Sequence, residues 1–128
     1  MGYPAHRLQP PKALLAIYPA ISGAALFSDL RHRGFLKTMF GENFGEKTKK
    51  EYDVPSHCGT FPPTYMAVGK HDLLISKKPL EAFRTLLQEK GIAAQLDIFP
   101  RAPHGFGDGS ATGAEGWIGR ADAFLAKL

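Results

Sequence analysis

Residues 64–72 of the chain read TYMAVGKHD, and residues 93–106 read AAQLDIFPRAPHGF. Each passage begins with a short run rich in apolar side chains, which predicts a strand, and then leaves that strand through a turn. Each turn carries a titratable side chain, Asp72 in the first and His104 in the second. In an open parallel sheet, functional groups gather beyond the carboxyl ends of the strands. The two side chains are therefore candidates for one shared site.

The residues between these two predicted strands have the pattern of a helix. Ser76 is a suitable amino-terminal cap, and Pro79 falls in the first turn, where proline is tolerated. Gly91 is a suitable end. The apolar stripe of the helix consists of Leu80, Phe83, Leu86 and Leu87. A strand, a helix and a strand in this order predict two parallel neighbours joined by a right-handed crossover.

The segment before residue 64 predicts one further strand and a long excursion. Residues 12–21 are nearly all apolar, which predicts a strand buried on both faces. Residues 22–62 predict irregular structure with short helices over 24–30 and 35–40, the second ended by Gly41.

The carboxyl-terminal part predicts an exposed strand and a closing helix. Residues 93–99 alternate between apolar and polar side chains, which favours a place near a sheet edge. Thr112 and Glu115 have the spacing of a capping box. The expected apolar face of the helix consists of Trp117, Ile118, Ala121, Phe124, Leu125 and Leu128. The whole order predicts an α/β fold with about three parallel strands and flanking helices.

Composition is that of an ordinary globular domain. The 128 residues are enough for one domain with a core, with 44% hydrophobic and 22% charged side chains. The net charge is +4, and its one compact basic run, residues 47–50, predicts a solvated loop rather than a nucleic-acid patch. No apolar run is long enough to cross a membrane. The first residues show no apolar signal core, which slightly favours a cytoplasmic location.

Asp72 and His104 have the residue types of the orienting acid and the general base of a nucleophilic triad. The chain contains no Gly-x-Ser-x-Gly motif that would supply the nucleophile. The alternative nucleophiles Cys58, Ser110, Ser22 and Ser56 are disfavoured, because none is expected on a strand-to-helix turn. A zinc site fits no recognised ligand spacing, and we expect neither a metal nor a cofactor. Its conceivable ligands would be His57, Cys58, His71 and Asp72.

Three segments in this order, residues 16–21, 62–72 and 98–106, resemble the carboxyl-terminal half of an α/β-hydrolase. The resemblance is greatest to the acetyl-esterase, acetylxylan-esterase and lipase-like branch. It covers most of residues 12–128 and is weakest over the variable excursion, 24–60, with 1–11 as a leader.

This resemblance implies that Asp72 is the triad acid and His104 the triad base. It also implies that the nucleophile and the oxyanion hole would lie before Met1. We therefore expect this chain to be one part of a longer hydrolase domain.

The function implied by the resemblance is that of a serine-type carboxylic ester hydrolase acting on short-chain acyl esters, with acetylated sugars as a plausible class. We expect no nucleic-acid or membrane partner, and no activity from the isolated chain. We also expect either self-association or a missing amino-terminal half, because residues 14–17 would present an unpaired apolar edge. Two alternatives stay open: a non-catalytic binding or assembly module, and a prolyl-oligopeptidase-type serine peptidase. The Pro-His-Gly-Phe turn at 103–106 favours the esterase branch.

Overall fold

The computed structural model describes residues 9, 11–23, 33–41 and 45–128. Their centre is a parallel sheet of three strands, β1 (Leu14–Ile17), β2 (Thr64–Gly69) and β3 (Ala94–Phe99), in the order β1-β2-β3. Leu14 lies opposite Thr64, and Thr64 lies opposite Ala94. The predicted α/β class with three parallel strands is confirmed.

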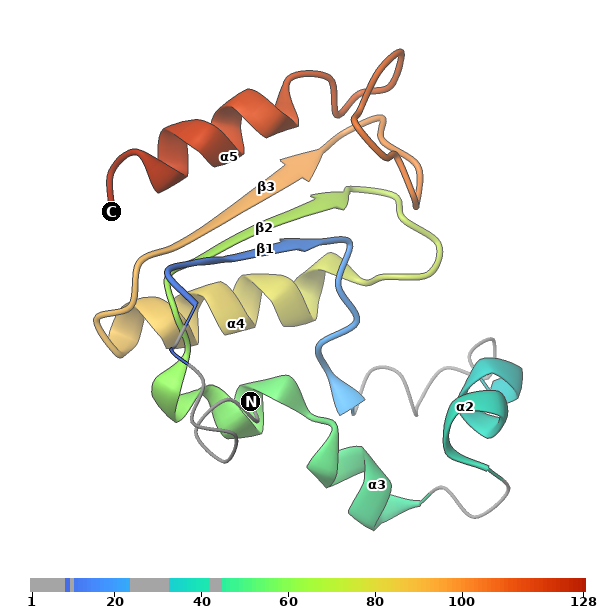
Figure 1. The fold of residues 1–128 in the computed structure, drawn as a ribbon. Helices are drawn as coiled ribbons and strands as arrows, with labels where there is room; N and C mark the ends of the chain where they lie inside the picture. Colours follow the sequence, from blue (N-terminus) through green and yellow to red (C-terminus); the bar gives the residue numbers. More distant parts are fainter. Residues whose placement is uncertain (1–8, 10, 24–32, 42–44) are drawn as a thin grey trace.

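Two helices cover the two faces of this sheet (Figure 1). Helix α4 (Lys77–Glu89) packs on one face and α5 (Trp117–Leu125) on the other. Side chains alternate along β2, so its even-numbered residues face α4 and its odd-numbered residues face α5. The core on the α4 side includes Met66, Val68, Leu80, Phe83, Leu87 and Leu96. The core on the α5 side includes Tyr65, Ala67, Phe99, Phe106, Ala121 and Phe124.

The first strand is shorter and more open than its sequence predicts. Only four residues of the predicted 12–21 form β1, and Leu15 keeps 44% of its surface exposed. Burial on both faces was therefore a wrong prediction. Within the described residues β1 has a neighbour on one side only, so its other side lacks the packing that a central strand receives. Among the described residues β3 lies at a sheet edge, as predicted, but the prediction of an exposed strand was wrong, because its residues are buried or half-buried.

The excursion between β1 and β2 contains more helix than predicted. Helix α2 (Arg33–Phe40) agrees with the helix predicted over 35–40, and Gly41 follows it with a φ of 76°. Two further pieces, α3 (Glu46–Glu51) and the 3-10 segment η2 (Val54–Thr60), replace predicted irregular structure. The helix predicted over 24–30 lies outside the described residues.

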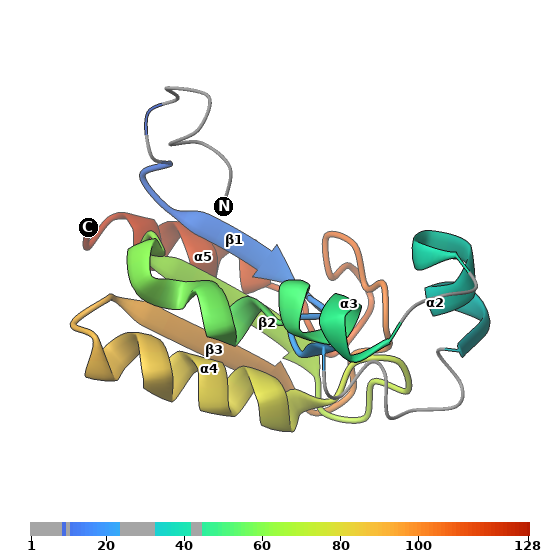
Figure 2. The same cartoon turned by 90° about the horizontal axis from the view of Figure 1, so that it is seen from below.

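These pieces form a second cover beside α4. In Figure 1, η2 and α3 lie below the sheet on the same side as α4, and in Figure 2, seen from below, they lie in front of it. Helix α2 lies apart from the sheet in both views. The basic run at 47–50 therefore belongs to α3 rather than to a loop, and Lys49 Nζ lies 3.2 Å from Glu46 Oε1.

The entry into α5 also differs from the prediction. The helix begins at Trp117, after Gly116 in the left-handed region, so Thr112 and Glu115 form no capping box. Instead, the Ala114 amide donates to Thr112 Oγ1 at 3.1 Å within a series of turns. The buried face of α5 is narrower than expected, because Ile118, Leu125 and Leu128 are exposed.

Ser76 does stand at the cap position of α4, but its side chain makes no capping hydrogen bond. Among the described helices, none is long and apolar enough to cross a membrane.

Candidate functional site

Asp72 lies in the turn that follows β2. The Lys70 amide donates to the Phe99 carbonyl at 2.8 Å and extends the β2–β3 pairing by one step, after which the chain turns away. One carboxylate oxygen of Asp72, Oδ1, accepts from the Leu74 amide at 2.8 Å and from the Ile75 amide at 2.9 Å. The side chain is fully enclosed. These two bonds fix the carboxylate and leave its other oxygen directed elsewhere.

That other oxygen meets His104. The distance from Asp72 Oδ2 to His104 Nδ1 is 2.9 Å. A carboxylate can only accept hydrogen bonds, so Nδ1 is the donor and Nε2 becomes the acceptor of the neutral ring. The His104 side chain is 34% exposed, in contrast to its enclosed partner. The arrangement suits proton acceptance at Nε2, because the buried carboxylate binds the other ring nitrogen, Nδ1, and so orients the ring.

The absence of a side chain at Gly69 lets the turn after β2 and the turn after β3 approach each other. Gly69 ends β2, and a Cβ atom built there would overlap the backbone carbonyl of Ala102 in the turn after β3. Only glycine allows such a close approach of two backbones. This contact draws the turn that carries His104 against the turn that carries Asp72.

The turn of His104 is anchored on the α5 core through Phe106. The Phe106 ring is buried and lies 6.0 Å from Phe99 and 6.2 Å from Trp117, measured between ring centroids. Trp117 Nε1 donates to the Gly107 carbonyl at 2.9 Å. His104 is thus exposed on a turn whose next aromatic residue is fixed in the core.

Tyr18, directly after β1, completes the surroundings of His104. Its ring centroid lies 4.9 Å from that of His104 and 5.1 Å from that of Phe106. Its backbone has a φ of 41°, in the left-handed region. A non-glycine residue there costs about 1–3 kcal/mol and is found most often at functional sites. The sequence analysis assigned no site role to Tyr18 or Gly69, although a Tyr-Pro pair after a strand is a visible signal of a constrained turn.

The alternative nucleophiles have other surroundings. Cys58 is buried in the core on the α4 side. Ser56 Oγ donates to Asp53 Oδ2 at 2.7 Å. Ser110 is exposed, and its amide donates to Asp108 Oδ1 at 2.9 Å, which helps hold the pKa of that carboxyl below its usual range. Ser22, just beyond β1, is half-buried.

The conceivable zinc ligands do not come together. In the described part of the chain, no three His, Cys, Asp or Glu side chains are grouped closely enough to hold a metal ion. His57 Nε2 lies 3.1 Å from the Glu51 carbonyl oxygen, and His71 is exposed in the turn before Asp72.

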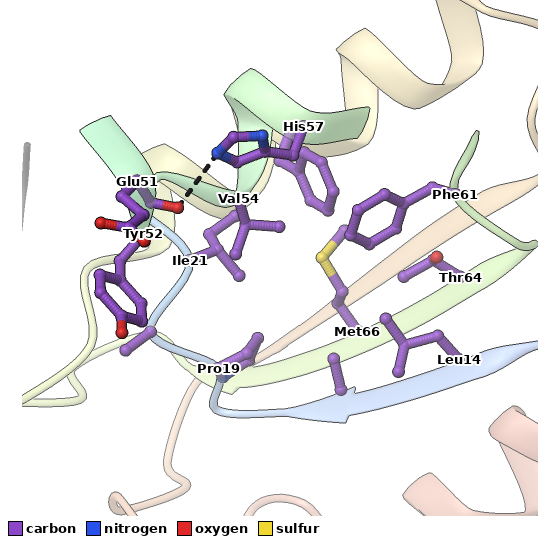
Figure 3. Close-up of a pocket in the computed structure, with 13 residues that line it drawn as sticks. Leu14, Pro19, Ile21, Glu51, Tyr52, Val54, His57, Phe61, Thr64 and Met66 are labelled. Carbon is purple, nitrogen blue, oxygen red and sulfur yellow. Dashed lines mark hydrogen bonds between the residues drawn. The ribbon is translucent and has the colours of Figure 1, made fainter. Parts of the chain in front are cut away.

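An apolar cavity of about 540 Å³ lies along β1 on the α4 side of the sheet (Figure 3). Side chains of β1 and β2 form its floor, and those of α3 and η2 form one wall. Its lining includes Leu14, Ala16, Ile21, Val54, Phe61 and Met66. Leu14 and Ala16 in this lining belong to β1, the strand that has a neighbour on one side only among the described residues.

Comparisons with known proteins identify the fold to which this site belongs. No family model matches the chain, and no curated protein matches its sequence. The acetyl ester-xyloside bifunctional hydrolase of Caldicellulosiruptor lactoaceticus is similar in structure, with a TM-score of 0.78 and 24% identity over 91% of this chain and 42% of that one. Carboxyl esterase 2 of the mycorrhizal fungus Tuber melanosporum gives a TM-score of 0.72 and 22% identity, over 98% and 47% of the two chains. The acylaminoacyl peptidase of Pyrococcus horikoshii gives a TM-score of 0.68 and 15% identity, over 90% of this chain and 19% of that one.

These likenesses show a partial α/β-hydrolase fold. The chain spans about half the length of the two esterase-type structures. The resemblance predicted from the sequence is confirmed at the level of fold.

Proposed function

We propose that this chain supplies the acid and the base of a serine-type carboxylic ester hydrolase, with the serine contributed by residues outside these 128. The observation that carries the proposal is the contact between His104 Nδ1 and Asp72 Oδ2 at 2.9 Å, beyond the carboxyl ends of β2 and β3. A general base held by a buried carboxylate, on a fold shared with esterases, has the geometry that ester hydrolysis needs.

In this mechanism His104 transfers one proton in each of two half-reactions, first from the serine to the leaving alcohol and then from water to the serine oxygen. The serine oxygen attacks the ester carbonyl carbon while His104 Nε2 takes the serine proton. The imidazolium then gives that proton to the leaving alcohol as the carbon–oxygen bond breaks, and an acyl-serine remains. A water molecule repeats the sequence and releases the carboxylic acid. Asp72 keeps Nδ1 protonated, so that Nε2 faces the reacting atoms, and stabilises the charged ring.

The substrate class proposed is short-chain acyl esters, including acetylated sugars. It is supported by the fold similarity to the acetyl ester-xyloside hydrolase and the carboxyl esterase, with TM-scores of 0.78 and 0.72, and by the Pro-His-Gly-Phe turn at 103–106. The second candidate is an acylaminoacyl peptidase, supported by TM-scores of 0.70 and 0.68 to two structures of that class. Both reactions use the same acid and base, and only the leaving group differs.

The proposed partner is the remaining part of the hydrolase domain, docked on β1. The Leu14 amide donates to the Pro63 carbonyl at 2.8 Å, and the Tyr18 amide donates to the Ala67 carbonyl at 2.6 Å. Since alternate residues of a strand direct their amides to the same side, Leu15 and Ile17 direct theirs away from β2. A further parallel strand would pair there.

The same partner would fill the apolar cavity beside β1. Residues on the cavity floor, such as Leu14 and Ala16, come from that strand, so one strand-and-helix unit could cover both the strand edge and the cavity. Without this partner, the unpaired edge of β1 is open to pairing with a strand of another chain. The alternative reading as a non-catalytic assembly module is supported by this same surface.

The test uses the completed protein, meaning this chain together with the segment that carries the nucleophile, expressed from the reading frame extended upstream of the Met1 codon. We expect an in-frame Gly-x-Ser-x-Gly upstream, turnover of p-nitrophenyl acetate, and little cleavage of an acylaminoacyl p-nitroanilide. The chain alone should hydrolyse the ester no faster than its His104→Ala variant. A completed protein that cleaves only the anilide would support the peptidase, and one without either activity would support the assembly module.

A further inference from the structure

We propose that Tyr18 is a positioning residue for His104, with its ring serving as a wall that keeps the imidazole on Asp72. This inference deepens the proposed function and rests on it. Three independent features of Tyr18 carry it: its backbone conformation, the residue that follows it, and the two rings that it touches.

The backbone of Tyr18 is held where its sequence disfavours it. A φ of 41° places it in the left-handed region, which a bulky side chain rarely adopts. The next residue is Pro19, and a residue before proline is restricted to extended conformations. The surroundings must therefore impose this conformation. Strain of this kind persists only where the surrounding structure over-determines it, and it clusters at functional sites.

The left-handed conformation of Tyr18 sets the direction in which its ring points. β1 runs beside β2, and the hydrogen bond from the Tyr18 amide to Ala67 keeps this residue in the sheet up to the turn. The left-handed step then brings the side chain to the turn after β3, which lies two strands away in the sheet order. The ring contacts both His104 and Phe106, tilted at 58° to the first ring and nearly perpendicular, at 86°, to the second.

His104 requires such a wall. Its hydrogen bond to Asp72 fixes one atom of a ring that is one-third exposed, and rotation about the side-chain bonds would break that bond. Tyr18 occupies one side of the imidazole and is itself backed by the buried Phe106. A base whose rotamer is locked by packing keeps Nε2 aligned with the reacting atoms throughout turnover.

The test measures the Nδ1 proton of His104 by NMR in the full chain labelled with ¹⁵N-histidine. In the wild type we expect a downfield resonance whose exchange with solvent is slow and which is absent in His104→Gln. Tyr18→Ala should accelerate that exchange by about tenfold, whereas Tyr18→Phe, which keeps the ring, should stay within about twofold of the wild type. Methyl resonances of Val68 and Leu87 report whether the core is intact.

Tyr18→Leu provides a second variant if Tyr18→Ala disturbs the core. It fills the space against Phe106 but offers the imidazole no flat surface, so we expect faster exchange here too. In the completed protein, Tyr18→Ala should lower kcat by about tenfold with KM within about twofold, and Tyr18→Phe should restore kcat.

Two results overturn different claims. Exchange that is unchanged in both Tyr18→Ala and Tyr18→Leu, with an intact core, would show that Tyr18 does not position His104, and the Asp72–His104 pair would stand. A wild-type resonance that survives in Asp72→Asn would instead overturn the pair on which the proposed function rests.

Discussion

The backbone carbonyl of Ala102 occupies the space into which a side chain at Gly69 would project. Gly69 is the last residue of β2, and Ala102 lies midway between the end of β3 and His104. The separation of the two candidate catalytic side chains therefore depends on a residue that has no chemistry of its own. The close approach of Gly69 and Ala102 also explains why a carboxylate and an imidazole 32 positions apart in the chain meet at hydrogen-bond distance.

Replacing Gly69 with alanine should separate the two turns. We expect Gly69→Ala to cost about 1–3 kcal/mol in the free energy of unfolding, because a backbone carbonyl must move to admit the new methyl group. The urea midpoint measures this. Gly119→Ala is the matched control, since a Cβ atom there meets open space in α5 and alanine favours a helix over glycine. If the two variants had equal midpoints, the close approach would not constrain the site.

Strain at Tyr18 predicts an unusual order of stabilities. Alanine normally gives a more stable protein than glycine, because glycine loses more backbone entropy on folding. At a φ of 41° the order should reverse, since the left-handed region costs an L-residue about 1–2 kcal/mol. Tyr18→Gly should therefore unfold at a higher urea concentration than Tyr18→Ala, although both lose the ring. The ordinary order would mean that the turn relaxes and stores no strain.

The open side of β1 predicts how the isolated chain associates. We expect self-association at micromolar concentration, measured by sedimentation, and a shift to monomer in Leu15→Pro. Leu15 directs its amide away from β2, so proline removes a donor needed for pairing with another chain and spares the existing sheet. Ala16→Pro is the contrasting variant, because the amide of Ala16 faces β2 and its loss should unfold β1. A wild-type chain that stays monomeric would mean that this edge is already covered.

The sequence predicted the parts of the fold that rest on local patterns. The strands β2 and β3 and the helix α4 follow from apolar periodicity and from prolines and glycines at their ends, and all three were located closely. The start of α5 was missed, because the spacing of Thr112 and Glu115 satisfies the capping rule while the chain there forms turns around Thr112. A local rule cannot tell which of two local hydrogen-bond patterns the tertiary structure selects.

The site was predictable only in part. Asp72 and His104 were predicted to lie together because each follows a strand of the same sheet, and their contact at 2.9 Å agrees with that prediction. Tyr18 and Gly69 lie in segments that carry the resemblance but were not predicted as site residues, because their contacts are with residues distant in sequence, His104 and Ala102 respectively. The exposure of Leu15 could not be predicted either. The apolar run at residues 12–21 reports hydrophobicity, but it does not report which strands lie beside β1.

A buried tyrosine on the α5 side of the sheet, Tyr65, predicts that the stability depends on alkaline pH. Burial, reinforced by the hydrogen bond from Tyr65 to Asp97 at 2.8 Å, raises the pKa of Tyr65 well above its ordinary value. The neutral phenol is favoured in the folded state, so its contribution is complete below the unfolded-state pKa of about 10. As the pH rises above 10, the unfolded chain loses the proton first and the stability falls. Urea midpoints of the wild type should drop more steeply above pH 10 than those of Tyr65→Phe, and parallel curves would contradict this origin.

The most direct test of the central claim is the effect of single substitutions at Asp72 and His104 on kcat/KM for p-nitrophenyl acetate in the completed protein. His104→Ala removes the base, and Asp72→Asn retains the shape of the side chain but loses the acceptor charge. We expect each to lower kcat/KM by about 10³-fold or more, with the core intact. His71→Ala, in an exposed neighbouring histidine, should stay within about twofold of the wild type. Activity that survives His104→Ala, or that falls equally in His71→Ala, would contradict the assignment of Asp72 and His104 as acid and base.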